Sequence, residues 1–219
     1  MIIIGLFGKT GSGKTEILEE LKKNYSVVDI ECCANTRGSV LGDLYDLKQK
    51  TQSEFDNCLK KQHEFAKNKG YCIVEFEGRK IGGAEKIDIP EPYSSLEKYS
   101  YNILIECSYD SQIERLLRLY IPKNDFEKEI AINKFLDLKK AFSKPDKLKI
   151  LDEIIFLVQN DRYLEASRMI EKELYSEHYL RHIRKVKHDL LVENNNILES
   201  AEIISKYVDK ILKKHEINP

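Results

Sequence analysis

The 219-residue sequence lacks an excess of charge of one sign, a cysteine spacing typical of a metal site, and an apolar run of membrane length. Its 36 Lys and Arg balance 37 Asp and Glu, so the overall charge neither favours nor excludes a nucleic-acid partner. Its 5 cysteines include no C-x₂-C pair, which argues against a zinc site and predicts reduced thiols packed in a core. The first residues carry no basic leader. We therefore expect a cytoplasmic protein that does not associate with a membrane.

A glycine-rich loop is the most informative segment that is present. Residues 8–15 read G-K-T-G-S-G-K-T, a full match to the phosphate-binding pattern G-x-x-x-x-G-K-[ST]. An apolar run typical of a buried strand precedes the loop, and helical periodicity follows it, which is the context that the motif requires. Backbone amides and a helix N-terminus would then bind phosphate. The predicted binding residues are Gly8, Gly11, Ser12, Gly13, Lys14, which would reach the terminal phosphate, and Thr15, whose hydroxyl would bind Mg²⁺.

The first half of the sequence alternates predicted strands and helices. Strands are expected at 25–30, 71–76 and 101–107, and helices at about 52–68 and 111–120. This alternation predicts right-handed crossovers and a mostly parallel sheet. From about residue 126 the pattern is almost wholly helical, with breaks at Pro145, Asn160-Asp161 and 194–196. We therefore predict an α/β fold, a P-loop NTPase-like three-layer sandwich over residues 1–122, with a helical C-terminal region over residues 123–219.

Acidic residues stand at the ends of two predicted strands. Asp29 and Glu31 end the second strand, and Glu75 and Glu77 end the third. Ligands of open α/β sheets bind at the carboxyl ends of the strands, so these acids can face the loop. A phosphate-loop enzyme needs such acids to hold Mg²⁺ or to orient a nucleophile. We predict Mg²⁺ ligands at Thr15, Asp29 and Glu75, the alternative being that the acids are solvated strand-end charges.

Arginines that can neutralise phosphate charge are the second requirement of such a site. Arg37 lies in a polar, glycine-containing stretch and Arg79 lies just past the third strand, while Arg115 and Arg118 share one helix face. We predict catalytic roles for Lys14, Arg37, Glu75 and Arg79, and phosphate-binding roles for Arg115 and Arg118. Each arginine taken alone is also consistent with a surface charge.

A basic segment, residues 181–188, reads R-H-I-R-K-V-K-H on a predicted late helix. Such a segment could bind a nucleic-acid backbone, with Tyr179 or a histidine stacking on a base. A solvated helix face is an equally good interpretation of the same residues.

Several segments together resemble the tRNA 2-selenouridine synthases. Ala34–Ser39 (A-N-T-R-G-S) is similar to a stretch of that family, with Thr36 where a histidine is usual. Residues 75–82 (E-F-E-G-R-K-I-G) are similar to a second signature, with Gly78 in place of a serine. Weaker similarities are Gln52-x-x-Phe55, an E-R-x-x-R element at 114–118, and residues 173–179. The resemblance runs from the loop to about residue 180.

The resemblance implies a transferase that acts on the wobble 2-thiouridine of tRNA. That family attaches a geranyl group to the sulfur and then replaces the geranylated sulfur with selenium from selenophosphate. Geranyl diphosphate and selenophosphate would be substrates, Ser39 would join the binding residues, and residues 123–219 would contact tRNA or a partner. The sequence has no rhodanese-like segment before the loop, so we expect a rhodanese-domain protein in trans.

Two other functions are compatible with the loop. One is a small-molecule or nucleotide kinase that uses ATP and Mg²⁺, with Arg115 and Arg118 as lid arginines and Asp29 orienting the acceptor hydroxyl. The other is a tRNA-binding module whose loop is a nucleotide-regulated docking element for the rhodanese partner. Whether ATP or GTP binds is left open by the motif.

Overall fold

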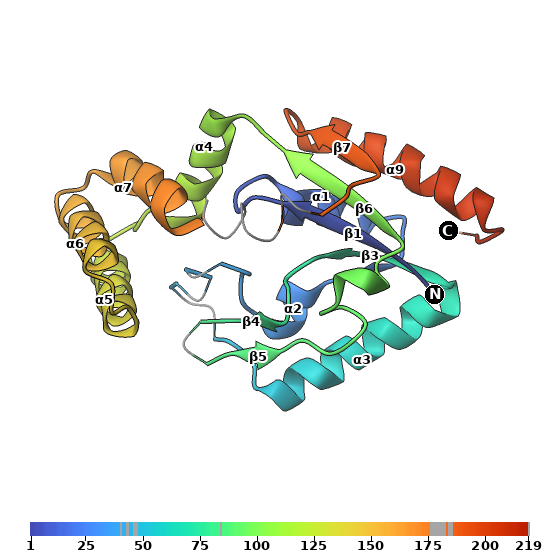
Figure 1. The fold of residues 1–219 in the computed structure, drawn as a ribbon, viewed down its shortest axis with the longest axis horizontal. Helices are drawn as coiled ribbons and strands as arrows, with labels where there is room; N and C mark the ends of the chain where they lie inside the picture. Colours follow the sequence, from blue (N-terminus) through green and yellow to red (C-terminus); the bar gives the residue numbers. More distant parts are fainter. Residues whose placement is uncertain are drawn as a thin grey trace.

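A five-stranded parallel sheet forms the centre of the protein (Figure 1). The computed structural model describes residues 1–39, 41–42, 44–45, 48–83, 85–175, 183 and 186–218. The strands lie in the order β2–β3–β1–β6–β7. Their bounds are Ile2–Gly8 for β1, Val27–Val28 for β2, Tyr71–Glu75 for β3, Tyr101–Glu106 for β6 and Leu190–Glu193 for β7. The predicted parallel α/β sheet is confirmed.

Helices cover both faces of the sheet because side chains alternate along each strand. On β1, Ile4 and Leu6 point to one face and Ile3 and Phe7 to the other. The first face packs on α1 (Lys14–Leu21) and α9 (Ile197–Lys214). The second face packs on α2 (Ile30–Ala34), α3 (Gln52–Lys69), the hairpin β4 (Lys80–Ile81) with β5 (Ile87–Asp88), and the segment around η1 (Leu96–Lys98). The result is the expected three-layer sandwich.

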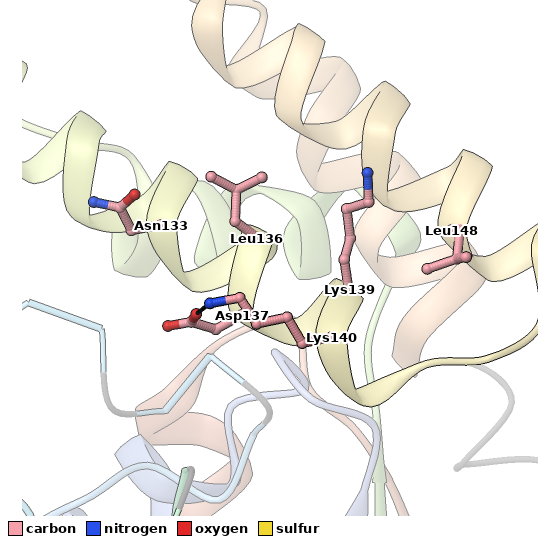
Figure 2. A pocket seen from close by; sticks show the side chains of 6 residues that line it. All are labelled: Asn133, Leu136, Asp137, Lys139, Lys140 and Leu148. Atoms are coloured by element: carbon pink, nitrogen blue, oxygen red, sulfur yellow. Dashed lines mark hydrogen bonds and ion pairs between the residues drawn. The ribbon is translucent and has the colours of Figure 1, made fainter.

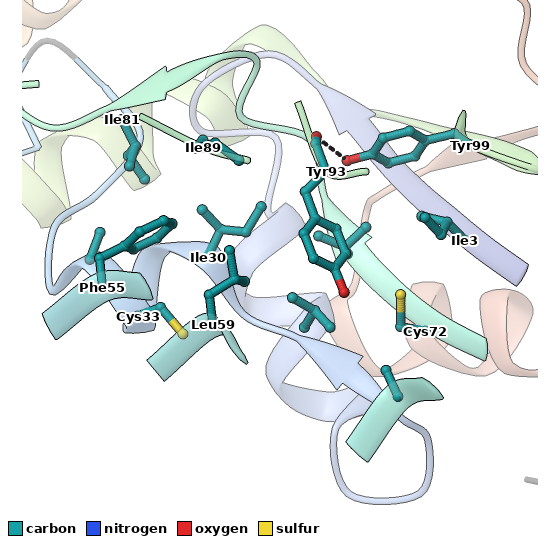
Figure 3. Packing of buried hydrophobic residues seen from close by; sticks show 14 of the residues in the cluster. Ile3, Ile30, Cys33, Phe55, Leu59, Cys72, Ile81, Ile89, Tyr93 and Tyr99 are labelled. Carbon is teal, nitrogen blue, oxygen red and sulfur yellow. Dashed lines mark hydrogen bonds between the residues drawn. The ribbon is translucent and has the colours of Figure 1, made fainter. Parts of the chain in front are cut away.

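The core beneath the second face combines aromatic rings with aliphatic side chains (Figure 3). Tyr93 and Tyr99 lie among aliphatic side chains of α2, α3 and the hairpin, and the Tyr99 hydroxyl donates to the Tyr93 carbonyl at 2.8 Å. Gly5 of β1 leaves room for the rings of Phe7 and Tyr99, which a β-carbon there would meet. This packing holds β1 against β6 on the side away from α1.

The register of the central strands determines where the glycine loop leaves the sheet. Leu6 pairs with Glu75 of β3, and Gly8 pairs with Ile105 of β6. The chain therefore leaves β1 between the carboxyl ends of two neighbouring strands. Ligands of open parallel sheets bind at that edge.

Four helices form a lobe beside the sheet, drawn at the left of Figure 1. They are α4 (Tyr109–Tyr120), α5 (Asp125–Ala141), α6 (Pro145–Gln159) and α7 (Tyr163–Ile170), followed by the π-helical turn η2 (Glu171–Tyr175). The lobe has its own apolar core, which Leu41 and Leu44 join. Within the described residues, the helices are all too short or too polar to cross a membrane.

Local sequence signals explain where several helices begin and end. Thr51 and Glu54 form a reciprocal capping box at the start of α3, and Gly70 ends that helix with φ 80°. Pro145 begins α6, and the Asn196 side chain accepts from two backbone amides at the start of α9. The predicted breaks at Pro145 and 194–196 are confirmed.

The C-terminal region differs from the prediction. Residues 190–193 are strand β7, whose Leu190 and Val192 pair in parallel with Ile103 and Ile105 of β6. The boundary at residue 122 therefore does not separate the sheet from the rest of the chain, because β7 and α9 complete the sandwich. The strand is four residues long, and the partner that stabilises it lies about 90 positions earlier. Periodicity within the segment could not reveal it.

The second strand is also shorter than predicted. It comprises Val27–Val28 alone, and Asp29 is the N-cap of α2, where its side chain accepts from the Cys32 backbone amide at 2.9 Å. Glu31 therefore lies on a helix and not at a strand end. Aspartate three residues before a helical amide is a strong capping signal, and it overrides the β-propensity of Ile30.

Two neighbouring isoleucines test the assignment of α9 to the core. Ile204 is fully buried and Ile203 is 48 % exposed. We expect Ile204→Ala to lower the free energy of unfolding by about 2–5 kcal/mol, because it leaves a cavity between α9 and the sheet. Ile203→Ala should change it by about 0.5 kcal/mol or less. Urea unfolding curves measure both, and equal effects would contradict the packing of α9.

Candidate functional site

The glycine loop connects β1 to α1 and has the backbone geometry of an anion site. Gly11 and Gly13 have φ values of 82° and 93°, in the left-handed region that favours glycine. Gly13 is the N-cap of α1, and its carbonyl accepts from the Ile17 amide at 3.0 Å. The first amides of a helix have no carbonyl partner within the helix, and the helix dipole adds positive potential there. The loop can therefore bind phosphate oxygens.

Lys14 lies across the loop. Its Nζ donates to the carbonyls of Gly8 at 3.1 Å and Lys9 at 2.9 Å, and lies 3.3 Å from Glu75 Oε1. The Lys14 side chain is 11 % exposed and the Glu75 side chain 8 %. The ammonium group is thus held at the mouth of the loop by groups that an incoming phosphate can replace.

Thr15 joins two carboxylates from different elements. Its hydroxyl donates to Glu75 Oε2 at 3.1 Å, and Glu31 Oε2 lies 3.5 Å away. A hydroxyl and carboxylate oxygens are hard ligands of the kind that Mg²⁺ prefers. Across the described residues there is no cluster of three or more His, Cys, Asp or Glu able to hold a metal ion. A Mg²⁺ ion here would therefore be held by Thr15, Glu75 and Glu31 together with water or ligand phosphate, as is usual for this ion.

Three acids, Glu31, Glu75 and Glu77, crowd this region, and the pKa values of Glu31 and Glu77 are raised there. Burial, followed by the charge of Glu75, raises the pKa of Glu31 from its usual 4.5 to about 8. Burial and the charges of Glu75 and Glu31 raise the pKa of Glu77 well above its ordinary value. The charge of Lys14 opposes both shifts. The cluster thus holds protons that a cation or a positively charged group can replace.

Asp29 does not occupy the position predicted for it. One of its carboxylate oxygens caps α2, and the other lies 3.3 Å from Lys22 Nζ. The carboxylate that reaches Thr15 beside Glu75 is that of Glu31, two residues further along the chain. The cause is the early end of β2, which places position 31 on α2 facing the loop.

The segment containing Arg37 and Ser39 is tied to the same cluster. The Gly38 amide donates to Glu31 Oε1, and a β-carbon on Gly38 would meet the Glu77 carboxylate. Ser39 Oγ lies 2.6 Å from the hydroxyl of Tyr120 at the end of α4. Arg37 Nη1 and the Ser12 hydroxyl of the loop are buried and have no hydrogen-bond partner within the described residues. Both are available to an anion.

The remaining predicted arginines separate. Arg115 Nη1 donates to the Gly11 carbonyl at 3.3 Å, so this arginine of α4 contacts the loop. Arg118 is 70 % exposed and pairs with Glu114 on the surface of α4. Arg79 is exposed in the turn after β3. The structure brings Lys14, Thr15, Glu75 and Arg115 together, and it leaves Arg118 and Arg79 outside these contacts.

Two side chains that contact the loop were not among the predicted site residues. Gln112 of α4 donates to the Thr10 carbonyl, and Asn194, after β7, donates to the Ser12 carbonyl, both at 2.8 Å. Asn194 is fully buried. Its position in an asparagine run suggested only a break between helices, so the sequence carried no separate signal for it.

Two other features lie apart from the loop. Half of the basic segment 181–188 lies outside the described residues, which include Ile183 and positions 186–188 of it. A pocket on the helical lobe is lined by Asn133, Leu136, Asp137, Lys139, Lys140 and Leu148 (Figure 2). Asp137 and Lys140 pair with each other there at 2.7 Å, and no predicted site residue lines the pocket.

Comparisons with known proteins match the whole chain. A family model described as the tRNA 2-selenouridine synthase AAA domain matches residues 1–193. An uncharacterized protein of Methanocaldococcus jannaschii is 54 % identical over 99 % of this chain and 96 % of its own length. The tRNA 2-selenouridine synthase of Nitrosomonas eutropha is 25 % identical over 99 % of this chain. The alignment spans only 58 % of the length of that synthase.

Solved structures are similar at a lower level. An uncharacterized protein of Eubacterium ventriosum has a TM-score of 0.38 at 15 % identity, covering 95 % of this chain and 99 % of its own. A shikimate kinase of Bacteroides thetaiotaomicron has the same TM-score and identity, covering 95 % and 98 %.

The raised proton affinity of Glu31 predicts a pH-dependent effect of Glu31→Gln. The folded protein holds the Glu31 proton more tightly than the unfolded protein, so the wild-type free energy of unfolding falls as pH rises from about 4.5 to about 8. Glutamine removes this loss. Between pH 5 and pH 8 we therefore expect the free energy of unfolding of Glu31→Gln to rise by about 1–3 kcal/mol relative to that of wild type.

Urea unfolding in metal-free buffer at both pH values measures this gain. Glu64→Gln, on the exposed face of α3, is the matched control and should show no pH-dependent difference. A difference between Glu31→Gln and wild type that does not change with pH would contradict the crowded-acid account.

Proposed function

Because the chain belongs to the tRNA 2-selenouridine synthase AAA-domain family, we propose that it is the P-loop component of such a synthase. Its substrate would be the wobble 2-thiouridine of tRNA. The loop would bind the diphosphate of geranyl diphosphate in a first step and selenophosphate in a second. The position of Lys14 carries this proposal, since its ammonium group lies at the mouth of the loop, on the carbonyls of Gly8 and Lys9 and next to Glu75.

The first step suits a loop that stabilises a leaving group. The thiouridine sulfur attacks the allylic carbon of geranyl diphosphate, a C–S bond forms, and the C–O bond to diphosphate breaks. Negative charge then accumulates on the departing diphosphate. The donors that can stabilise this charge as it develops are the amides of residues 11–15, the Lys14 ammonium and Arg37 Nη1, which is buried and has no hydrogen-bond partner among the residues that the structure describes. A thioamide sulfur is already nucleophilic, and the N3 proton, which alkylation of the sulfur makes acidic, leaves to water, so no strong base is needed.

Mg²⁺ would supply additional neutralisation of the diphosphate oxygens. Thr15, Glu75 and Glu31 are the residues that would hold it. Lys14 would exchange its contacts with the Gly8 and Lys9 carbonyls for phosphate oxygens. Glu75, freed from Lys14, would then face the cation.

The selenium step would need a partner in trans. A phosphate group of selenophosphate fits the same loop chemistry. Its selenium would attack C2 of the geranylated base, the C–S bond would break with loss of geranylthiolate, and hydrolysis of the Se–P bond would release phosphate and leave selenium on the base. The cysteines near the site, Cys32, Cys33 and Cys107, are not activated, because burial raises the pKa of each and keeps it as a thiol. A rhodanese-domain protein with a reactive cysteine would therefore assist, while residues 181–188 of this chain would contact the tRNA backbone.

A kinase is the second candidate function. A threonine hydroxyl beside two carboxylates, as at Thr15, is also the arrangement that a Mg²⁺-bound nucleotide requires. Arg115 of α4, which contacts the loop, could bind the phosphates of that nucleotide. A kinase would consume ATP with a small acceptor and without RNA. The synthase component would form a hydrophobic tRNA product from geranyl diphosphate without ATP.

Replacement of Lys14 tests the proposal. With thiolated tRNA and geranyl diphosphate, we expect Lys14→Ala to lower the rate of tRNA geranylation by about 10²-fold or more, because one donor to the leaving group is lost. Lys23→Ala, at the exposed end of α1, is the matched control and should keep the wild-type rate. Chromatography of tRNA digests measures the hydrophobic nucleoside.

Three results would contradict the proposal. Undiminished geranylation by Lys14→Ala would show that the loop does not stabilise the leaving group. ATP consumption with a small acceptor and no tRNA product in the wild-type protein would favour the kinase. Nucleotide-dependent capture of a rhodanese protein with neither product would favour a docking module.

A further inference from the structure

Side chains from outside the loop hold three consecutive loop carbonyls. The Thr10 carbonyl accepts from Gln112 Nε2 at 2.8 Å, and the Gly11 carbonyl accepts from Arg115 Nη1 at 3.3 Å. The Ser12 carbonyl accepts from Asn194 Nδ2 at 2.8 Å. Gln112 and Arg115 come from α4, whereas Asn194 comes from the connection between β7 and α9. Two separate elements therefore turn the loop carbonyls outward.

Asn194 is the best fixed of these side chains. It is fully buried, and its Oδ1 accepts from the Ser200 hydroxyl at 3.0 Å. Ser200 itself is only 1 % exposed. Its own backbone amide donates to the Glu106 carbonyl at 2.6 Å. A carbonyl can only accept, so the NH₂ end of the Asn194 amide must face Ser12. The Ser12 carbonyl therefore sets the orientation of the amide, and the Ser200 hydroxyl on α9 donates to its oxygen and holds the side chain in place.

This contact determines where the next amide points. In a trans peptide the C=O and the following N–H point in opposite directions. Because Asn194 holds the Ser12 carbonyl on the outer side of the loop, the Gly13 N–H is directed to the inner side. That amide stands at the N-terminus of α1, next to Lys14, where phosphate oxygens would bind.

The space around Gly13 supports the same arrangement. A β-carbon at Gly13 would meet Asn194 Nδ2, and it would lie 3.0 Å from Ile197 Cδ1. The close approach of Asn194 therefore requires glycine at this position in addition to its φ value. The match to the family model ends at residue 193, so Asn194 and Ser200 fall just beyond it.

We propose that Asn194 is a positioning residue that orients the Gly13 amide of the phosphate loop toward the bound diphosphate, with Ser200 fixing the Asn194 amide. The proposal rests on the proposed function only in requiring that the loop bind a diphosphate. Asn194 does not touch the ligand, and it acts through the peptide between Ser12 and Gly13.

The test uses inorganic pyrophosphate as the probe, titrated calorimetrically into the full chain in the presence of Mg²⁺. We expect Asn194→Asp to weaken binding by about tenfold or more at pH 8, because an ionised carboxylate cannot donate to the Ser12 carbonyl. At pH 5.5 the buried acid is protonated, its O–H can donate again, and the loss relative to wild type should largely disappear.

Two further variants separate positioning from folding. Asn194→Ala cannot donate at any pH and should bind about tenfold more weakly than wild type at both pH values. Asn195→Asp changes the exposed neighbour in the same way and should match wild type at both. A thermal melt of each variant gives its folded fraction, so that affinities refer to folded protein.

The outcomes distinguish the two proposals. Wild-type affinity in folded Asn194→Ala, or an Asn194→Asp defect that does not recover at low pH, would overturn the positioning role and leave the proposed function standing. Pyrophosphate binding with the expected pattern, but no geranylation of tRNA, would overturn the proposed function and leave the positioning role. No binding of pyrophosphate by wild type would overturn both.

Discussion

A phosphate loop binds an anion only while its amides face inward and its carbonyls face outward, and the rest of this structure serves that constraint. Peptide groups in a short glycine-rich loop can turn over at small cost, so something must hold each carbonyl. Here Gln112 and Arg115 of α4 and Asn194 beyond β7 do so. Strand β6 makes this possible, because α4 follows it in the chain and β7 pairs along it. The helical lobe, through α4, and the segment after β7 therefore both contact the same loop.

At the inner side of the loop, the positive charge of Lys14 lies beside a group of acidic side chains. Lys14 faces Glu75. Burial and the charge of Glu75 raise the pKa of Glu31, and burial and the charges of Glu75 and Glu31 raise the pKa of Glu77. An approaching diphosphate would draw Lys14 away from Glu75 and increase the repulsion among the acids. A divalent cation at Thr15 would relieve that repulsion, which couples anion binding to cation binding in the proposed mechanism.

The sequence predicted the parts of the site that depend on local pattern. The G-K-T-G-S-G-K-T loop, its flanking strand and helix, and Glu75 at the end of β3 all lie where periodicity and motif placed them. Glu31, and not the predicted Asp29, lies beside Thr15 because strand propensity and helix capping compete in residues 29–32. Asp29 caps α2 there, so the strand ends before it. Strand β7 and Asn194 could not be predicted, because each is defined by a partner far along the chain.

A structure of the chain with pyrophosphate and Mg²⁺ bound would test the central claim most directly. The account predicts phosphate oxygens on the amides of Gly13, Lys14 and Thr15, the Lys14 ammonium moved from the Gly8 and Lys9 carbonyls to the phosphate, and the contact between Asn194 and the Ser12 carbonyl unchanged. Pyrophosphate bound away from the loop, or a Ser12 carbonyl turned inward toward it, would contradict the account.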